Sequence, residues 1–244
     1  MKKIFLFILV LTAMGLFADA NADLLKASKK GKLQAVKNAL EAGANVNTMN
    51  KDRETPLLLS SEKGKVEVIE YLLSRKADMK AKNVYGYTAL ILASKNGHIE
   101  VINLLLRKGA KIDERDNGGF SPLIYAAKHS HGDAVELLIK KGANVNAQNS
   151  SKNTALMFAA YSGSPNVMKF LLAKGAKVDL RNSSGQTALI WATGDGKLKS
   201  VKILLEAGAN VNARDKRGKT AMLFAKRMRR NDLIQLLKEY GAVD

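Results

Sequence analysis

The sequence repeats itself with a period of 33 residues, and no other feature restricts the possible folds as strongly. A Gly-Ala pair recurs at this step from Gly43-Ala44 to Gly241-Ala242, and only Lys76-Ala77 lacks the glycine. A second column at the same step is Thr or Ser, followed two positions later by Leu or Met. Its members are Thr55, Thr88, Ser121, Thr154, Thr187 and Thr220. Because both columns stay in register without an insertion, we predict a tandem array of one structural unit.

Each unit is predicted to be a short hairpin followed by two antiparallel helices. After Thr88, Leu90 and Ala93 recur at helical spacing, and Gly97 ends this first helix. Residues 99–108 again have apolar residues at helical spacing and predict the second helix. The Gly- and Asn-rich stretch between units is too short for a long strand, so it predicts a turn or hairpin.

These motifs resemble the ankyrin repeat, whose signature is 33 residues with Thr-Pro-Leu-His-x-Ala. The closest matches begin at Thr55 and Ser121, and the variant Thr-Ala-Leu-x-x-Ala begins at Thr88, Thr154 and Thr187. The resemblance extends over residues 22–244. It implies an all-α solenoid of ankyrin repeats, in which each repeat is a β-hairpin or turn plus an antiparallel helix pair.

One departure from the family is systematic. The position of the family's histidine is apolar in all six repeats that have the Thr or Ser column, which predicts apolar contacts in place of histidine hydrogen bonds between hairpins. The residues at this position are Leu58, Ile91, Ile124, Met157, Ile190 and Leu223.

The repeats are predicted to fill one domain, residues 21–244. The first lacks the Thr-x-Leu signature, and the last has Arg229 in place of the turn glycine, so both are predicted to be caps. The repeats are 22–49 (N-terminal cap), 50–82, 83–115, 116–148, 149–181, 182–214 and 215–244 (C-terminal cap).

Residues 1–20 have the pattern of a secretory signal peptide. Lys2 and Lys3 precede the mainly apolar residues 4–17, and small residues suited to cleavage follow, so we predict cleavage near Ala20 or Ala22. An uncleaved N-terminal anchor is the alternative. The absence of cysteine fits a bacterial periplasm or exterior, so we expect an exported protein that is periplasmic or secreted.

The composition leaves little for catalysis. With no cysteine, the chain has no disulfide, thiolate metal site or cysteine nucleophile, and it has only three histidines. His98 follows a turn glycine and is expected to be structural. His129 and His131, near Asp133, leave open a weak surface metal site, although their spacing is poor for metal ligation. We therefore expect no enzyme activity, no cofactor and no metal.

Large aromatic residues occupy positions that face partners in the ankyrin family, at hairpin tips and on the exposed side of the first helix. Central aromatic side chains are typical binding anchors, but they can also pack on neighbouring hairpins. A further column, four residues after each Thr or Ser, either lines the groove or is partly buried: Leu59, Leu92, Tyr125, Phe158, Trp191 and Phe224. The predicted partner-binding residues are Tyr85, Tyr87, Phe120, Lys128, His129, Tyr161 and Trp191.

The formal charge of +18 indicates anionic partners or surfaces. Basic residues gather in the first cap and in the last repeat, either as a docking patch or as a solvated cap. The C-terminal basic patch is Lys216, Arg217, Lys219, Arg227, Arg229 and Arg230. No nucleic-acid-binding module is recognisable, so nucleic acid is not an expected partner.

These features together predict a non-catalytic scaffold for protein–protein interaction in the cell envelope or exterior. We expect it to be monomeric and to bind other proteins on its concave ankyrin surface. The alternative is a module that binds an anionic envelope polymer or a lipid surface through its basic terminal repeats.

Overall fold

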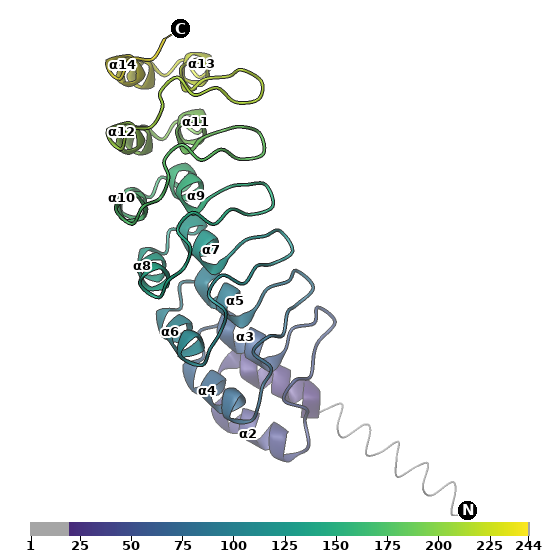
Figure 1. The fold of residues 1–244 in the computed structure, drawn as a ribbon. Coiled ribbons are helices and arrows are strands. Elements are labelled where there is room, and N and C mark those ends of the chain that lie inside the picture. Colours follow the sequence, from purple (N-terminus) through teal and green to yellow (C-terminus); the bar gives the residue numbers. More distant parts are fainter. Residues whose placement is uncertain (1–19, 244) are drawn as a thin grey trace, which may run out of the picture. The chain divides into compact units, whose positions relative to one another are not determined.

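The computed structural model describes residues 20–243, so the predicted signal peptide, apart from Ala20, lies outside the described residues. The chain divides into two compact units, Met1–Lys111 and Ile112–Asp244, and the described residues of each form helix pairs (Figure 1). No helix among the described residues has the length and apolarity needed to cross a lipid bilayer.

In the first unit, the helical residues 20–30 pair with α2 (Leu33–Glu41). The next pairs are α3 (Pro56–Glu62) with α4 (Val66–Ser74), and α5 (Ala89–Lys95) with α6 (Ile99–Arg107). The second unit contains α7 (Pro122–Lys128) with α8 (Gly132–Lys140), and α9 (Ala155–Ser162) with α10 (Pro165–Ala173). It continues with α11 (Ala188–Gly194) and α12 (Leu198–Glu206), then α13 (Ala221–Arg227) and α14 (Asn231–Glu239). The predicted all-α ankyrin architecture is confirmed.

The Thr and Ser column caps the first helix of each pair. In every case the side-chain oxygen accepts a hydrogen bond from the backbone N–H three residues later, at 3.2 to 3.4 Å. This bond satisfies one of the backbone donors that a helix start leaves free. The Leu or Met two residues after the cap is buried in each repeat.

A column of Asn and Asp residues, which was not predicted from the sequence, shapes the hairpins. Each side-chain Oδ1 accepts the backbone N–H groups two and four residues later, at 2.8 to 3.0 Å. The members are Asn50, Asn83, Asp116, Asn149, Asn182 and Asp215. Between residues 20 and 243 the hairpins contain no regular strand, only an isolated bridge between Gln148 and Thr154.

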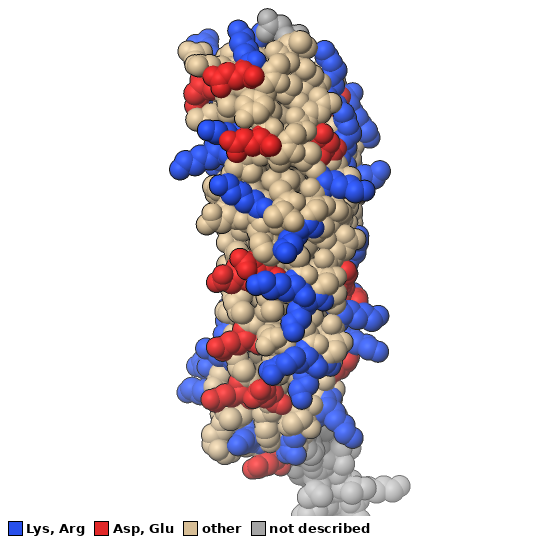
Figure 2. Space-filling view, turned by 60° about the vertical axis from the view of Figure 1, so that its left-hand side comes forward, with Lys and Arg blue, Asp and Glu red and all other residues tan. Residues whose placement is uncertain are grey.

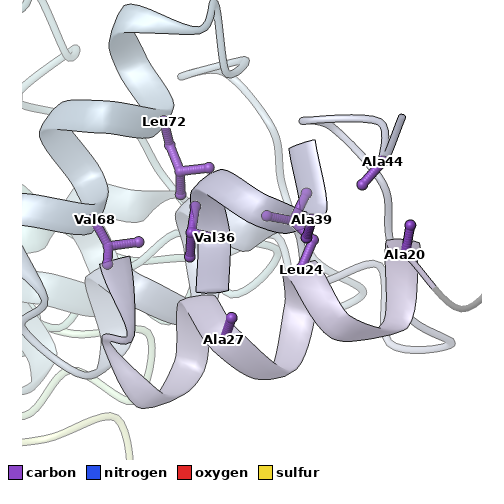
Figure 3. Close-up of a cluster of buried hydrophobic side chains, with 8 residues drawn as sticks. All are labelled: Ala20, Leu24, Ala27, Val36, Ala39, Ala44, Val68 and Leu72. Atoms are coloured by element: carbon purple, nitrogen blue, oxygen red, sulfur yellow. The ribbon is translucent and has the colours of Figure 1, made fainter. Parts of the chain in front are cut away.

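The apolar residues at the family's histidine position are buried in every described repeat that has one, except the last. In the second unit Ile124, Met157 and Ile190 are at most 1% exposed, whereas Leu223, in the last helix pair that the structure describes, is 41% exposed. At the N-terminus, a cluster of small and branched side chains joins residues 20–30 to α2 and α4 (Figure 3). These residues are Ala20, Leu24, Ala27, Val36, Ala39, Ala44, Val68 and Leu72.

The turns between helices require a left-handed backbone, and among the described residues five non-glycine residues adopt it where other repeats have glycine. Arg53 and Lys152 do so in the hairpins, and the other three follow helices. Ser130 and Arg229 have φ values of 61° and 54° at the turn within a helix pair. Lys76, the exception in the Gly-Ala column, has φ of 65°. A left-handed conformation costs an L-residue about 1–2 kcal/mol, so these sites store strain.

We expect Lys76→Gly to raise the free energy of unfolding by about 0.5–1 kcal/mol, because it removes this strain while glycine adds freedom to the unfolded chain. Urea unfolding followed by circular dichroism measures the change. The matched control is Gly109→Ala, one repeat later, where φ is +90° and nothing lies within 4 Å of an added Cβ. It should destabilise the protein by about 1 kcal/mol. A loss of stability in Lys76→Gly would contradict the strain assignment.

Candidate partner-binding surface

A continuous row of aromatic rings follows the first helices of the second unit. The ring centroids of Phe120 and Tyr125 are 5.1 Å apart, and those of Phe120 and Phe158 are 5.5 Å apart. The Trp191 ring lies 5.5 Å from Phe158 and 5.8 Å from Tyr161, both in edge-to-face geometry. Such contacts orient each ring by its neighbours, so the row is a preformed surface.

Two members of this row are held by hydrogen bonds to hairpin residues. The Tyr125 hydroxyl donates to Asp116 Oδ2 at 2.6 Å, and the Trp191 Nε1–H donates to Gln186 Oε1 at 2.8 Å. Asp116 also shapes the hairpin through its other oxygen. The hairpin and the first helix of a repeat are therefore joined at the aromatic surface.

The column four residues after the cap becomes more exposed toward the C-terminus. Tyr125 and Phe158 are 6% and 8% exposed, whereas Trp191 and Phe224 are half-buried. Of the two interpretations of this column, burial therefore describes Tyr125 and Phe158. Trp191 and Phe224 are open enough to line a groove.

The aromatic residues at the partner-facing positions divide in the same way. Tyr85 and Tyr161 are 61% and 51% exposed, whereas Tyr87 and Phe120 are half-buried. Tyr87 lies beside Tyr85, with ring centroids 5.6 Å apart. Phe120 packs in the row described above. Two of the predicted anchors are thus accessible, and the other two also pack within the protein.

Cations of the chain cover several of these rings. Lys95 Nζ is 5.1 Å from the Tyr87 centroid, and Lys128 Nζ is 5.3 Å from the Phe120 centroid and 5.7 Å from that of Phe158. Lys128 and His129 are themselves exposed, and the His129 ring stacks on Tyr125 with a centroid distance of 6.3 Å. These two predicted contact residues belong to the surface.

A hollow of about 410 Å³ lies at the C-terminal part of the row, in the second unit. Its wall is mainly aromatic, with one carboxylate and one amide. The lining residues are Phe158, Tyr161, Gln186, Ile190, Trp191, Gly194, Asp195 and Phe224. Trp191 and Tyr161 were predicted to contact a partner and Phe224 to line a groove or be partly buried, whereas the part of Gly194 in this hollow was not predicted.

The comparisons with known proteins agree with this geometry. A family model for three copies of the ankyrin repeat matches residues 24–116, 111–182 and 156–244. The chain belongs to the ankyrin-repeat family. It is similar to the crystal structure of the human ASB11 ankyrin repeat domain, with 27% identity and a TM-score of 0.81 over 91% of this chain and 98% of that one. A search of the curated proteins found no match. Ankyrin repeats are generally protein–protein interaction modules, and the fold is typically a non-catalytic scaffold.

The histidines of this ankyrin array lie at its turns. His98 Nε2 lies 2.8 Å from the Glu62 carbonyl oxygen, and its ring packs beside Gly64 of the preceding repeat, as expected for a structural residue. His129 and His131 stack with ring centroids 6.2 Å apart. Within residues 20–243, no group of three or more His, Asp or Glu side chains is placed to hold a metal ion.

Only some side chains of the C-terminal basic patch are exposed and could contact a partner protein. Lys216, Arg217, Arg227 and Arg229 are exposed, but Lys219 is half-buried with its Nζ 5.8 Å from the Phe224 centroid. Residues 216–230 contain no acid, but Arg230 pairs with the next acid along the chain. Its Nη2 lies 2.7 Å from Asp232 Oδ2, and this hydrogen bond lowers the pKa of Asp232. On the face shown in Figure 2, acidic side chains lie among the basic ones in both units.

We expect Tyr125→Phe to lower the free energy of unfolding by about 1–2 kcal/mol, because the Asp116 carboxylate loses its hydrogen-bond donor. Tyr161→Phe is the matched control, since it removes the same hydroxyl from an exposed ring and should change stability by less than about 0.5 kcal/mol. Thermal and urea unfolding measure both variants. Equal effects at the two sites would show that the Tyr125 bond does not support the surface.

Proposed function

We propose that this ankyrin-repeat protein is an exported, monomeric, non-catalytic scaffold that binds partner proteins on the surface formed by its hairpins and first helices. The main support is an accessible tyrosine in each unit: Tyr85 beside Tyr87 in the first, and Tyr161 in the aromatic row of the second. Tyrosine supplies a large contact area and a hydroxyl at low entropic cost, which is why it is enriched among binding anchors. No cofactor is needed for this function.

The position of Tyr85 supports an anchoring role. Asn83 Oδ1 accepts the backbone N–H groups of Tyr85 and Tyr87, both at 3.0 Å, and the Val84 N–H donates to the carbonyl oxygen of Asp52 at 3.1 Å. The exposed ring is therefore carried by a hydrogen-bonded hairpin. Because the backbone at Tyr85 is already ordered, binding loses little conformational entropy there. More of the contact energy therefore contributes to affinity.

The basic ends favour a second candidate, binding to an anionic envelope polymer or lipid surface. In the last two repeats a hollow of about 500 Å³ is lined by Lys216, Arg217 and Lys219, with Asp215 as its acid. In the N-terminal cap a hollow of about 450 Å³ is lined by Lys26, Lys30 and Lys32, with Asp23 as its acid. Such sites attract polyanions in a salt-dependent manner.

We also propose that the chain is exported to the periplasm or the exterior, and that cleavage follows Ala20. A hydrogen bond supports cleavage after Ala20 over cleavage after Ala22. Asn21 Oδ1 accepts the backbone N–H of Asn45 at 2.8 Å. The same link recurs later, where Asn47 Oδ1 accepts the N–H of Asp78. Cleavage after Ala22 would remove Asn21 and leave the Asn45 N–H without this partner.

The binding proposal is tested with a photo-crosslinking amino acid at position 85 or 161, followed by identification of the captured protein and measurement of its affinity. Tyr85→Ala and Tyr161→Ala should each weaken binding by about tenfold or more, as for anchor residues. Tyr240→Ala, at a tyrosine that is 40% exposed beyond α14, is the control and should bind normally.

Measuring the affinity for the captured protein from about 50 to about 200 mM salt distinguishes protein binding through aromatic anchors from polyanion binding. Binding through aromatic anchors should change little over this range. A steep loss of affinity, with no effect of the tyrosine variants and a strong effect of Lys216→Gln and Arg217→Gln, would favour the polyanion function instead.

The export proposal is tested by N-terminal sequencing of the protein recovered from its own cells. We expect the mature chain to begin at Asn21, because that start retains the Asn21 bond to the N-terminal cap. A chain that begins at Met1 would support the uncleaved anchor, and one that begins at Asp23 would show that the Asn21 bond is dispensable.

A further inference from the structure

Three aromatic rings of the second unit form a corner that joins two consecutive repeats. Phe158 and Tyr161 come from one repeat, and the Trp191 ring of the next repeat packs against both, with centroid distances of 5.5 and 5.8 Å. The interplanar angles are 79° and 62°, so both contacts are edge-to-face. Aromatic pairs favour this geometry over a face-to-face sandwich.

One repeat later the same corner lacks its third ring. At a step of 33 residues, Trp191 corresponds to Phe158, Phe224 corresponds to Trp191, and Gly194 corresponds to Tyr161. A Cβ built on Gly194 would lie 3.7 Å from the Phe224 ring, so this position faces the ring of the next repeat. Because glycine has no side chain, the place of the third ring is open, and the hollow of about 410 Å³ lies there.

The residue before the cap shows which earlier repeat this hollow matches. The repeat that contains Tyr161 has an amide at this position, Asn153, and the repeat of the hollow has another amide, Gln186. The repeat before them instead has Phe120, whose ring centroid lies 5.3 Å from the ammonium of Lys128. The repeat register therefore favours an aromatic ring in the hollow over an ammonium group.

The charges at the hollow favour a neutral occupant. Its lining contains one charged residue, Asp195, whose Oδ2 already pairs with Lys197 Nζ at 3.1 Å. Lys219 Nζ lies 5.8 Å from the centroid of the Phe224 ring, so a second ammonium is also in place. A further charge of either sign would meet a like charge, whereas a neutral ring can enter without breaking an ion pair.

We propose that this hollow binds an aromatic side chain of a partner protein. The incoming ring takes the place that Tyr161 has in the preceding repeat, against the ring of Phe224 and with Trp191 as the second wall. This inference rests on the proposed partner-binding function and names the type of side chain that the partner presents. It can be tested without knowledge of the partner.

Trp191 is the only tryptophan of the chain, so its indole N–H gives a single NMR resonance that reports on the hollow. The full mature protein is titrated with Nα-acetyl-phenylalanine methylamide and, in parallel, with the cyclohexylalanine analogue, whose ring is saturated. We expect a saturable shift with the phenylalanine probe and binding about threefold weaker with the cyclohexylalanine probe, because ring–ring contacts add to the burial of apolar area. The lysine analogue, at matched ionic strength, should bind more weakly than either.

Gly194→Tyr is the decisive variant, because it supplies the missing ring from within the repeat. Gly194 is the last residue of α11 and does not have a left-handed backbone, so tyrosine fits without strain. We expect the variant to shift the Trp191 resonance without any probe and to abolish the response to the phenylalanine probe. Ala173→Tyr, at the exposed last residue of α10, adds the same ring away from the hollow and should respond as the natural protein does.

Three results would overturn the proposal. These are equal or tighter binding of the cyclohexylalanine or lysine probe, no saturable response to the phenylalanine probe, or an undiminished response in Gly194→Tyr. Because the titration uses no partner, its failure is distinguishable from a failure of the proposed function. A partner that still depends on Tyr85 and Tyr161 while the phenylalanine probe fails would remove only the aromatic site.

Discussion

The burial of apolar side chains between consecutive repeats is the interaction on which the rest of this structure depends. Ile124 and Ile190 are fully covered within the second unit, whereas Leu223, at the same repeat position, is 41% exposed. The residue type is similar in all three cases, so the difference comes from whether another repeat follows. A single repeat therefore has no core of its own, and the stability of each one resides largely in its contacts with its neighbours.

Local hydrogen bonds hold each repeat in the shape that makes this stacking possible. The cap residue, such as Thr187, starts the first helix, and the Asn or Asp five residues earlier, such as Asn182, folds the hairpin back onto itself. Because these bonds use two positions per repeat, the neighbouring surface positions can change without disturbing the backbone. The same backbone site thus carries a lysine at 128 and a glycine at 194.

The repeat period predicted the fold well because it reports on backbone geometry. The second helix expected over residues 99–108 is α6, Ile99–Arg107, and the Thr column caps helices as its spacing suggested. The Asn and Asp column had the same 33-residue step and was visible in the sequence, so it could have been found by the same test.

Side-chain exposure was less predictable from the sequence. The sequence left two interpretations open for the column that contains Tyr125, lining a groove or partial burial, and Tyr125 is buried. Periodicity describes one helix, whereas in a stack the adjacent repeat and the hairpin cover further sides of it. The half-burial of Phe120 arises in the same way, because its ring packs against Tyr125, Phe158 and Lys128.

The aromatic surface and the net charge of +18 act on different stages of binding. Long-range charge mainly raises the rate of encounter with an anionic partner, whereas buried anchors mainly slow dissociation. Lysines that lie over rings, such as Lys95 and Lys128, retain their charge and still contribute to the field. The charge and the anchors can therefore be changed independently, because the exposed basic residues Lys216 and Arg217 lie outside the aromatic row.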